Sequence, residues 1–251
     1  MFKQIVFILL LISYAYVNNS QGADDVWDEI RFKNLQPGKR YSISIGSGFF
    51  VNSNMIVTNR HVVQNCHNIA IRGAVPPTLA TLHLIDEELD LALIKSPIAA
   101  NRVPYLRNNF AAIKKDDILF SIGYPLKHRE SGVYIIKQAE VINSRIDPKS
   151  GFVQIEFTDT VDHGNSGGPL LDKNSNLVGV VTAKLTYKYQ DSTGKTSEKI
   201  VSMAIGVDGL IDFLKEAGIP YASSSTYDIF TNYHLDRLVK DYVVNIHCVS
   251  D

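Results

Sequence analysis

The sequence lacks an excess of charge of either sign. Its 251 residues include 25 Lys or Arg and 26 Asp or Glu, a formal net charge of −1. Nucleic acid and acidic membrane surfaces usually bind proteins with a basic excess, so we expect neither as a partner. The sequence also has no long run of like charge, no internal repeat and no cysteine spacing typical of a metal site, so we expect no bound metal.

Long apolar stretches are scarce as well. The one at the N-terminus, residues 5–17, follows Lys3 and is followed by small residues at 20–22. This pattern predicts a secretory signal peptide, residues 1–22, that is cleaved before Ala23. An uncleaved membrane anchor is the alternative, but the stretch is short for a bilayer span, and no other segment is long and apolar enough. We therefore expect an exported protein, periplasmic or secreted, without a stable membrane span after cleavage.

Cysteine is also rare, since Cys66 and Cys248 are the only two. Export would make a disulfide between them chemically feasible. The sequence does not show whether the two residues come within bonding distance. A disulfide that ties the C-terminal tail to the N-terminal half and a pair of buried thiols both remain open.

Beyond Tyr41 the sequence is mostly β-rich. Short segments of β-branched and aromatic residues alternate with turn signals such as Asn52-Ser53-Asn54. Many short strands separated by turns predict an all-β fold of barrels or sandwiches. The predicted strands are 43–51, 55–59, 81–85, 90–94, 117–123, 133–143, 153–158, 177–183 and 199–205.

Few segments have helical spacing. Residues 208–217 do, and Gly218 and Pro220 follow as stop signals. After a flexible break at 223–226, apolar residues between 229 and 243 recur at helical spacing and predict an amphipathic C-terminal helix on the body of the protein. A subunit contact is the less favoured use of that helix. Other predictions are a short helix within 24–33 and a polar loop over 184–198.

One segment, residues 164–170, places a serine among glycines. It reads Gly-Asn-Ser-Gly-Gly-Pro-Leu. Glycines allow close approach of a substrate carbonyl and the backbone dihedrals that turn N–H groups toward one point. Ser166 is therefore a candidate nucleophile, and Gly164, Asn165 and Ser166 are the candidate oxyanion hole, with the N–H groups of Gly164 and Ser166 as its natural donors. A glycine-rich turn with an incidental serine is the alternative.

Two further residues suit the roles of base and orienting acid. His61 ends an apolar strand at a strand-to-helix corner, and Asp90 lies among apolar residues. A buried carboxylate is costly without a partner, and a histidine N–H would supply one while fixing the tautomer of the ring. Either residue alone is more often structural, so their order along the chain matters.

The order His61, Asp90, Ser166 is similar to that of trypsin-like serine proteases of the chymotrypsin fold. The flanking strings resemble the HtrA/DegP-like branch more than digestive trypsins, in matching order over about residues 41–217. The strings are Gly46–Val51, Ile56–Val63, Asp90–Lys95, Ser121–Pro125, Gly164–Leu170 and Met203–Ile205.

This resemblance implies an architecture and a chemistry. The fold would be two six-stranded antiparallel β-barrels, with a short helix after the second. The parts would be residues 23–112 with His61 and Asp90, residues 113–217 with Ser166, and a helical tail at 218–251. Ser166 would cleave protein or peptide substrates through an acyl-enzyme without any cofactor. Only about thirty residues follow Ala217, too few for the PDZ domain usual in this branch. A homo-oligomer is compatible with the resemblance but is not established by it.

The resemblance also locates the pocket for the residue before the cut. No acid stands at Thr160, taken as the trypsin-like position, so a small or medium apolar side chain is expected. Asp162 could instead favour a basic residue, and His163 an acidic one, in that order. A catalytically silent binding module on a protease fold is the alternative function. The predicted pocket residues are Thr160, Val161, Val181, Thr182 and Ala183.

Overall fold

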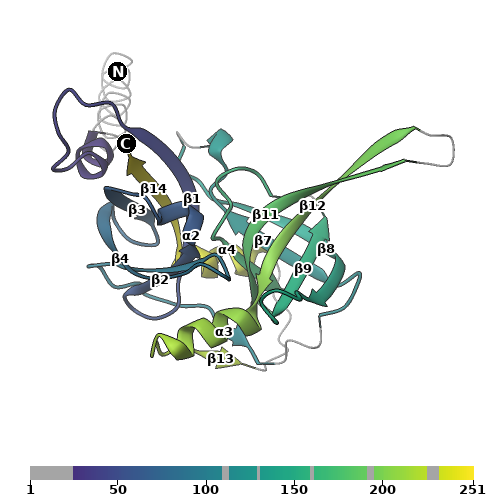
Figure 1. Ribbon diagram of the computed structural model, residues 1–251. Coiled ribbons are helices and arrows are strands. Elements are labelled where there is room, and N and C mark those ends of the chain that lie inside the picture. Colours follow the sequence, from purple (N-terminus) through teal and green to yellow (C-terminus); the bar gives the residue numbers. More distant parts are fainter. Residues whose placement is uncertain (1–24, 109–112, 129–130, 159–160, 191–194, 225–231) are drawn as a thin grey trace, which may run out of the picture.

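A computed structural model describes residues 25–108, 113–128, 131–158, 161–190, 195–224 and 232–251 (Figure 1). The predicted signal peptide and Thr160 lie outside these residues. No helix in these ranges is long and apolar enough to cross a membrane. The description below concerns these residues.

The first barrel is closed and antiparallel, with strand order β1-β14-β3-β4-β5-β2. Its interior is apolar, because the strands supply fully buried side chains such as Phe49, Ile56, Ile71 and Leu93. The strands are β1 (Ser42–Phe50), β2 (Met55–Asn59), β3 (Asn68–Gly73), β4 (Thr78–Asp86), β5 (Leu91–Lys95) and β14 (Val243–Ser250).

The second barrel contains the sheet order β10-β7-β8-β9-β12-β11, and pairing of β10 with β11 closes the ring. Two short strands, β6 (Leu106–Arg107) and β13 (Ser223–Ser224), extend the sheet in parallel beside β11. The two-barrel, chymotrypsin-like prediction is therefore confirmed. The ring strands are β7 (Ile118–Gly123), β8 (Ile135–Ile146), β9 (Val153–Thr158), β10 (Pro169–Asp172), β11 (Leu177–Gln190) and β12 (Thr196–Gly206).

The C-terminal tail differs from the predicted helix. Among the described residues of the tail, α4 (Asn232–Val239) is helical, and it is followed by β14, which pairs with β1 on one side and β3 on the other. Seven of the eight β14 residues are buried, because the strand lies inside the barrel wall and both of its faces are covered. The apolar pattern of a helix is hard to distinguish in the sequence from that of a strand buried on both faces. The run of β-branched residues from Val243 to Val249 was the signal for a strand.

A disulfide joins Cys66 and Cys248 across 182 residues of sequence, with a Cα–Cα distance of 5.1 Å. This resolves the alternative that the sequence left open. The bond links β14 to the segment just after α2 (Arg60–Val63), the short helix that contains His61. A disulfide that closes a long loop typically stabilises the folded state by about 2–4 kcal/mol. It therefore fixes the C-terminal strand beside the histidine.

Three further helical segments are short. The helix α3 (Val207–Glu216) follows β12, close to its predicted position, and buries its apolar face. Residues 25–31 are helical, as predicted for the region 24–33. A 3-10 turn, η2 (Leu126–His128), follows β7. α3 and α4 pack in the same apolar cluster as the first barrel, so this cluster joins the two halves.

The segment 184–198 is not the polar loop that was expected. β11 continues to Gln190 and β12 begins at Thr196, and residues 184–190 pair with residues 196–202. Figure 1 shows this hairpin projecting away from both barrels as a two-stranded arm. The alternation of Leu185, Tyr187 and Tyr189 with polar residues is typical of strands and was the signal that the loop prediction missed.

His247 of β14 is buried beside the helix at 25–31. Its ring makes an edge-on contact with Trp27, at 4.9 Å between centroids, and its Nδ1 lies 3.3 Å from Arg31 Nη1. Guanidinium groups only donate, so Nδ1 accepts and the ring is neutral. Burial first, and then the nearby charges of Arg31 and Arg72, lower the pKa of His247 to about 3.

This environment predicts a pH-dependent stability. The pKa of His247 is lower in the folded state than the ordinary value of about 6.5. The stabilisation that the neutral ring contributes to the folded state is therefore complete above pH 6.5 and is lost as pH falls toward 3. We expect the free energy of unfolding to fall by about 1.4 kcal/mol per pH unit from this residue between pH 6 and 4. Urea titrations of His247→Gln should give a flatter profile, whereas the exposed His83→Gln should match the wild type. Equal slopes in all three proteins would contradict the assignment.

Candidate active site

His61 and Asp90 come together because β2 and β5 are neighbours in the first barrel. His61 lies in α2, directly after β2, and Asp90 directly precedes β5. The distance from His61 Nδ1 to Asp90 Oδ2 is 2.6 Å. A carboxylate accepts, so Nδ1 is the donor and Nε2 is left free to take a proton. The predicted pair is therefore adjacent, with the tautomer that a general base requires.

Asp90 is held by several hydrogen bonds in an unusual backbone conformation, with φ of +55°. Its carbonyl accepts from the Arg60 N–H at 2.9 Å and from Asn59 Nδ2 at 3.1 Å. Its Oδ1 accepts from the His61 N–H at 3.0 Å. A non-glycine residue in the left-handed region persists when its surroundings fix it, and such residues often occur at functional sites. These bonds orient the carboxylate toward the imidazole.

Thr182, on β11, contacts both Asp90 and Ser166. Its Oγ1 donates to Asp90 Oδ2 at 3.2 Å, and its carbonyl accepts from Ser166 Oγ at 3.1 Å. Within the described residues, Ser166 Oγ makes no hydrogen bond with His61. The three residues predicted as a triad therefore lie around Thr182, with the serine hydroxyl turned toward the Thr182 carbonyl.

The loop before Ser166 presents two N–H groups. The His163 carbonyl accepts from the Leu126 N–H at 2.6 Å, which turns the other side of that peptide, the Gly164 N–H, the opposite way. Across the described chain, neither the Gly164 nor the Ser166 N–H has an intramolecular acceptor. Asn165 differs from its prediction as an oxyanion residue, because its N–H donates to the Asp162 carbonyl at 3.1 Å. The geometry thus leaves Gly164 and Ser166 as the available donors.

Two glycines of this loop have conformations that other residues rarely adopt. Gly164 has φ of +97°, and a Cβ there would lie 2.3 Å from the Tyr124 carbonyl oxygen. Gly167 has φ of +84°, and a Cβ there would lie 2.2 Å from the Ser47 carbonyl oxygen. Both the dihedrals and the space therefore require glycine.

Ser47, on β1 of the first barrel, holds this loop from the other side. Its Oγ donates to the Gly164 carbonyl at 2.7 Å and accepts from the Tyr124 N–H at 2.8 Å. Its own N–H donates to the Ser166 carbonyl at 2.8 Å. Ser47 is fully buried, so each of these bonds replaces contact with water. Sequence reasoning did not identify it, because serine in a glycine-rich strand has no distinctive local signal.

The residues of the predicted specificity pocket separate into two groups. Val161 and Val181 are buried in the apolar cluster of the second barrel. Thr182 is half-buried and Ala183 is exposed. Asp162, the alternative determinant, is bound by Lys127 Nζ at 2.7 Å and Lys137 Nζ at 3.2 Å. These ammonium groups, Lys127 first, lower the pKa of the Asp162 carboxyl.

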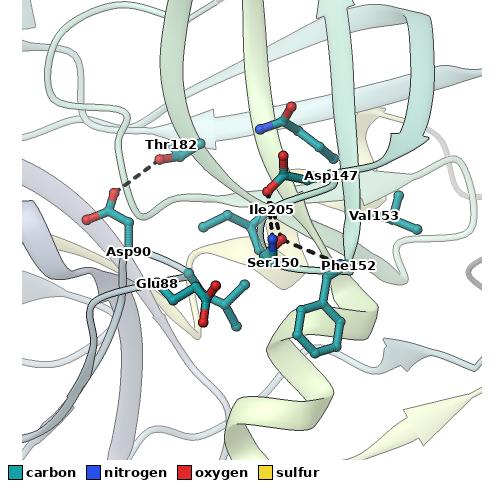
Figure 2. Close-up of a pocket in the computed structure, with 10 residues that line it drawn as sticks. Glu88, Asp90, Asp147, Ser150, Phe152, Val153, Thr182 and Ile205 are labelled. Carbon is teal, nitrogen blue, oxygen red and sulfur yellow. Dashed lines mark hydrogen bonds between the residues drawn. The ribbon is translucent and has the colours of Figure 1, made fainter.

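A cavity of about 170 Å³ lies beside Asp90 and Thr182 (Figure 2). Its wall shares Asp90 and Thr182 with the site, and Figure 2 shows Asp147 and Ser150 facing it from the β8–β9 turn. Backbone and side-chain hydrogen bonds from Ser150 lower the pKa of Asp147. The cavity lining is Glu88, Leu89, Asp90, Asp147, Ser150, Phe152, Val153, Gln154, Thr182 and Ile205.

Comparison with known proteins agrees with this geometry. The family model of the trypsin-like peptidase domain matches residues 46–180, more than half of the chain. The chain belongs to the trypsin-like peptidase family. The matched range includes His61, Asp90 and Ser166.

Similar sequences include HtrA proteases. The chain is 27% identical to serine protease HTRA1B of Danio rerio, over 75% of this chain and 38% of that protein. It is 31% identical to the uncharacterized protein y4bJ of Sinorhizobium fredii, over 76% of this chain and 30% of that protein. The chain therefore matches less than half the length of either relative.

Solved structures share the fold. The active form of the Rv3671c protease from M. tuberculosis superposes with a TM-score of 0.54 at 19% identity, covering 75% of this chain and 86% of that one. The HtrA-type protease AlgW, solved with a tripeptide, superposes with a TM-score of 0.52 at 20% identity, covering 70% and 61%. These structures confirm the fold, and the match to HTRA1B confirms the resemblance to HtrA proteases in sequence.

The position of Ser47 generates a prediction for this peptidase fold. Ser47→Ala leaves the buried Tyr124 N–H and Gly164 carbonyl without their partner, and each unsatisfied group costs about 1–3 kcal/mol. We expect the free energy of unfolding to fall by roughly 2–4 kcal/mol in a urea titration. Ser44→Ala, at an exposed position of the same strand, is the matched control. A loss of stability no larger than that of the control would contradict the role of Ser47 in holding the loop before Ser166.

Proposed function

We propose that this chain is a serine endopeptidase. The single observation on which the proposal depends is the 2.6 Å contact of His61 Nδ1 with Asp90 Oδ2 beside a serine in a loop with free N–H groups. A catalytically silent module would be expected to have lost one of these groups or to have blocked the loop. Neither change is present among the described residues, so the enzyme is favoured.

The proposed reaction uses His61 as the base, Asp90 as the group that orients it and Ser166 as the nucleophile. Ser166 Oγ attacks the peptide carbonyl as its proton passes to His61 Nε2, and the N–H groups of Gly164 and Ser166 bind the oxyanion. The imidazolium then protonates the leaving amine, and the acyl-enzyme is hydrolysed by water. The negative charge of Asp90 stabilises the imidazolium without itself accepting the proton.

Attack requires Ser166 Oγ to leave the Thr182 carbonyl and turn to His61 Nε2. Catalytic hydrogen bonds are often loose in the free enzyme and tighten when substrate binds. A substrate N–H that donates to the Thr182 carbonyl would compete with Ser166 for the same acceptor. Substrate binding would then release the hydroxyl for attack.

We infer protein or peptide substrates, a proposal that the tripeptide bound to AlgW supports. The proposed preference before the cut remains a small or medium apolar side chain. The two lysines on Asp162 already satisfy its charge, which argues against a basic residue at that position. We also propose that the protein is exported, and the disulfide supports an oxidising compartment.

The nucleophile is tested by Ser166→Ala. We expect this variant to fold and to lose hydrolysis of casein, because no hydroxyl remains to form the acyl-enzyme. A fluorophosphonate probe should label the wild type and Ser131→Ala, an exposed serine outside the site, but not Ser166→Ala. Casein hydrolysis that survives in Ser166→Ala would refute the nucleophile, and a folded wild type that neither labels nor hydrolyses would favour the silent module.

The support from Thr182 to Asp90 is tested by Thr182→Val, which keeps the shape of the side chain but removes Oγ1. A hydrogen bond to a charged group contributes about 1.5–3 kcal/mol, so we expect kcat on casein-derived peptides to fall roughly ten- to a hundredfold. Thr182→Ser retains a hydroxyl and should recover most of kcat. A rise in KM with kcat unchanged would show instead that Thr182 acts only in substrate binding.

A further inference from the structure

The helix at residues 25–31 is attached to the first barrel by few contacts. In Figure 1 it is the purple coil near the end marked C, beside β14. Trp27, with 3% of its surface exposed, is the only buried residue of this helix, and the others are half-buried or exposed. A segment with a single buried side chain has little local stability and can open while the rest of the fold stays intact. The attachment of this helix can therefore be lost separately from the two barrels.

The buried contact of Trp27 leaves polar atoms unsatisfied. Its ring packs edge-on against His247 of β14, and the guanidinium carbon of Arg72, on β3, lies 4.7 Å from its ring centroid. Within the described chain, Trp27 Nε1 and His247 Nε2 are buried without a hydrogen-bond partner. A buried polar atom without a partner costs free energy, so it weakens the packing that buries it. Burial of Trp27 therefore holds the helix less firmly than its buried area suggests.

The hydrogen bond between Arg31 and His247 is the polar link from the helix to β14. Arg31 Nη1 lies 3.3 Å from His247 Nδ1, and a guanidinium can only donate, so Nδ1 supplies the lone pair. The neutral ring then carries its proton on Nε2, and Nδ1 is the only atom that can take a second one. Protonation of His247 and its hydrogen bond from Arg31 are therefore mutually exclusive.

The charges around His247 also oppose its protonation. Arg31 of the helix and Arg72 of β3 both act on it, and burial first and then these two charges lower its pKa. Asp28 forms an ion pair with Arg31 Nη2, whereas no carboxylate bonds to His247 in the described part of the chain. A protonated ring would thus add a third positive charge beside two guanidinium groups. The residues that pair with His247 across the sheet do not titrate, and they are Ile45 and Ala70.

The contacts that follow the helix are not broken by mild acid. Asn68 Nδ2 donates to the carbonyls of Arg31 at 3.0 Å and Lys33 at 2.8 Å, and an amide does not titrate. Lys39 Nζ binds Asp251 Oδ1 at 2.5 Å. The hydrogen bond from Lys39, followed by that from a histidine, lowers the pKa of the Asp251 carboxyl. Lys39 therefore stays bound in mild acid, and any movement of the helix would end just before it.

We propose that residues 25–38 form an acid-released clasp, which lies on β14 while His247 is neutral and detaches when His247 is protonated, before the barrels unfold. Gly38, at the end of the clasp, has φ of +80°, and among the described residues nothing but its chain neighbours lies within 4 Å of the position of a Cβ. This residue can therefore serve as the hinge. Release uncovers the outer faces of β3 and β14. The inference does not depend on the proposed function, because no residue of the clasp belongs to the candidate active site.

Trp27 is the only tryptophan of the sequence, so the fluorescence of the protein reports on the clasp. The pKa of His247 is about 3 in the docked state, below its ordinary value of 6.5, so docking is strongest above pH 6.5 and weakens by up to about tenfold per pH unit toward pH 3. In a titration over this range we expect the emission maximum to move to longer wavelength and acrylamide quenching to rise severalfold. At the midpoint of this change, the circular dichroism of the strands should be unaltered.

Two variants test the role of His247. His247→Gln cannot take the proton but keeps an oxygen that can accept from Arg31, so Trp27 should stay protected from acrylamide at a pH where the wild type is released. The exposed His83→Gln is the matched control and should follow the wild type. Asn68→Ala removes two hydrogen bonds from the clasp and leaves His247 in place, so its midpoint should move to higher pH.

Two results would overturn the proposal. One is exposure of Trp27 only together with loss of the strand signal, which would mean that the helix leaves when the whole protein unfolds. The other is the same midpoint in His247→Gln and the wild type. Should His247→Gln fail to fold, an unchanged midpoint in Asn68→Ala would contradict the clasp on its own. None of these measurements uses hydrolysis, so their outcome is independent of the protease assignment.

Discussion

The hydroxyl of Ser47 joins the two barrels at the point where the site is built. It is buried on β1 of the first barrel, yet both of its partners, the Tyr124 N–H and the Gly164 carbonyl, belong to the second. His61 and Asp90 lie on the first barrel and Ser166 on the second, so their relative position depends on how the barrels dock. A short buried hydrogen bond allows only a narrow range of distances and angles. It therefore fixes the position of the Ser166 loop relative to His61 more closely than apolar contacts alone would.

The parts of the site that were predictable from sequence are those with a local chemical requirement. Gly164 and Gly167 need dihedrals and space that only glycine offers, and Asp90 needs a partner because it lies among apolar residues. Ser47 has no such local signal, because its importance comes from residues that are 77 and 117 positions away. Asn165 was misjudged for a related reason. Its N–H satisfies the turn that shapes the loop, which sequence position alone does not reveal.

The fold was predictable to a similar degree. Strands whose sequence alternates in polarity, such as β9, were located well, whereas β14 is buried on both faces and was read as a helix. The arm was read as a loop because lysines and threonines occur on a ribbon that has no core to cover. In both cases the environment of the segment, rather than its composition, decided its structure.

The position of β14 makes the placement of His61 dependent on a strand that is distant in the sequence. Without β14, the first barrel would have a gap between β1 and β3. β14 is separated from β1 by most of the sequence. Such non-local pairing closes late, because a long loop must be ordered before the contacts form. The disulfide to Cys66 then links the strand to the segment that follows α2, where His61 lies. Since β14 closes the barrel that places His61 and Asp90, the position of both residues depends on a strand that lies far from them in the sequence.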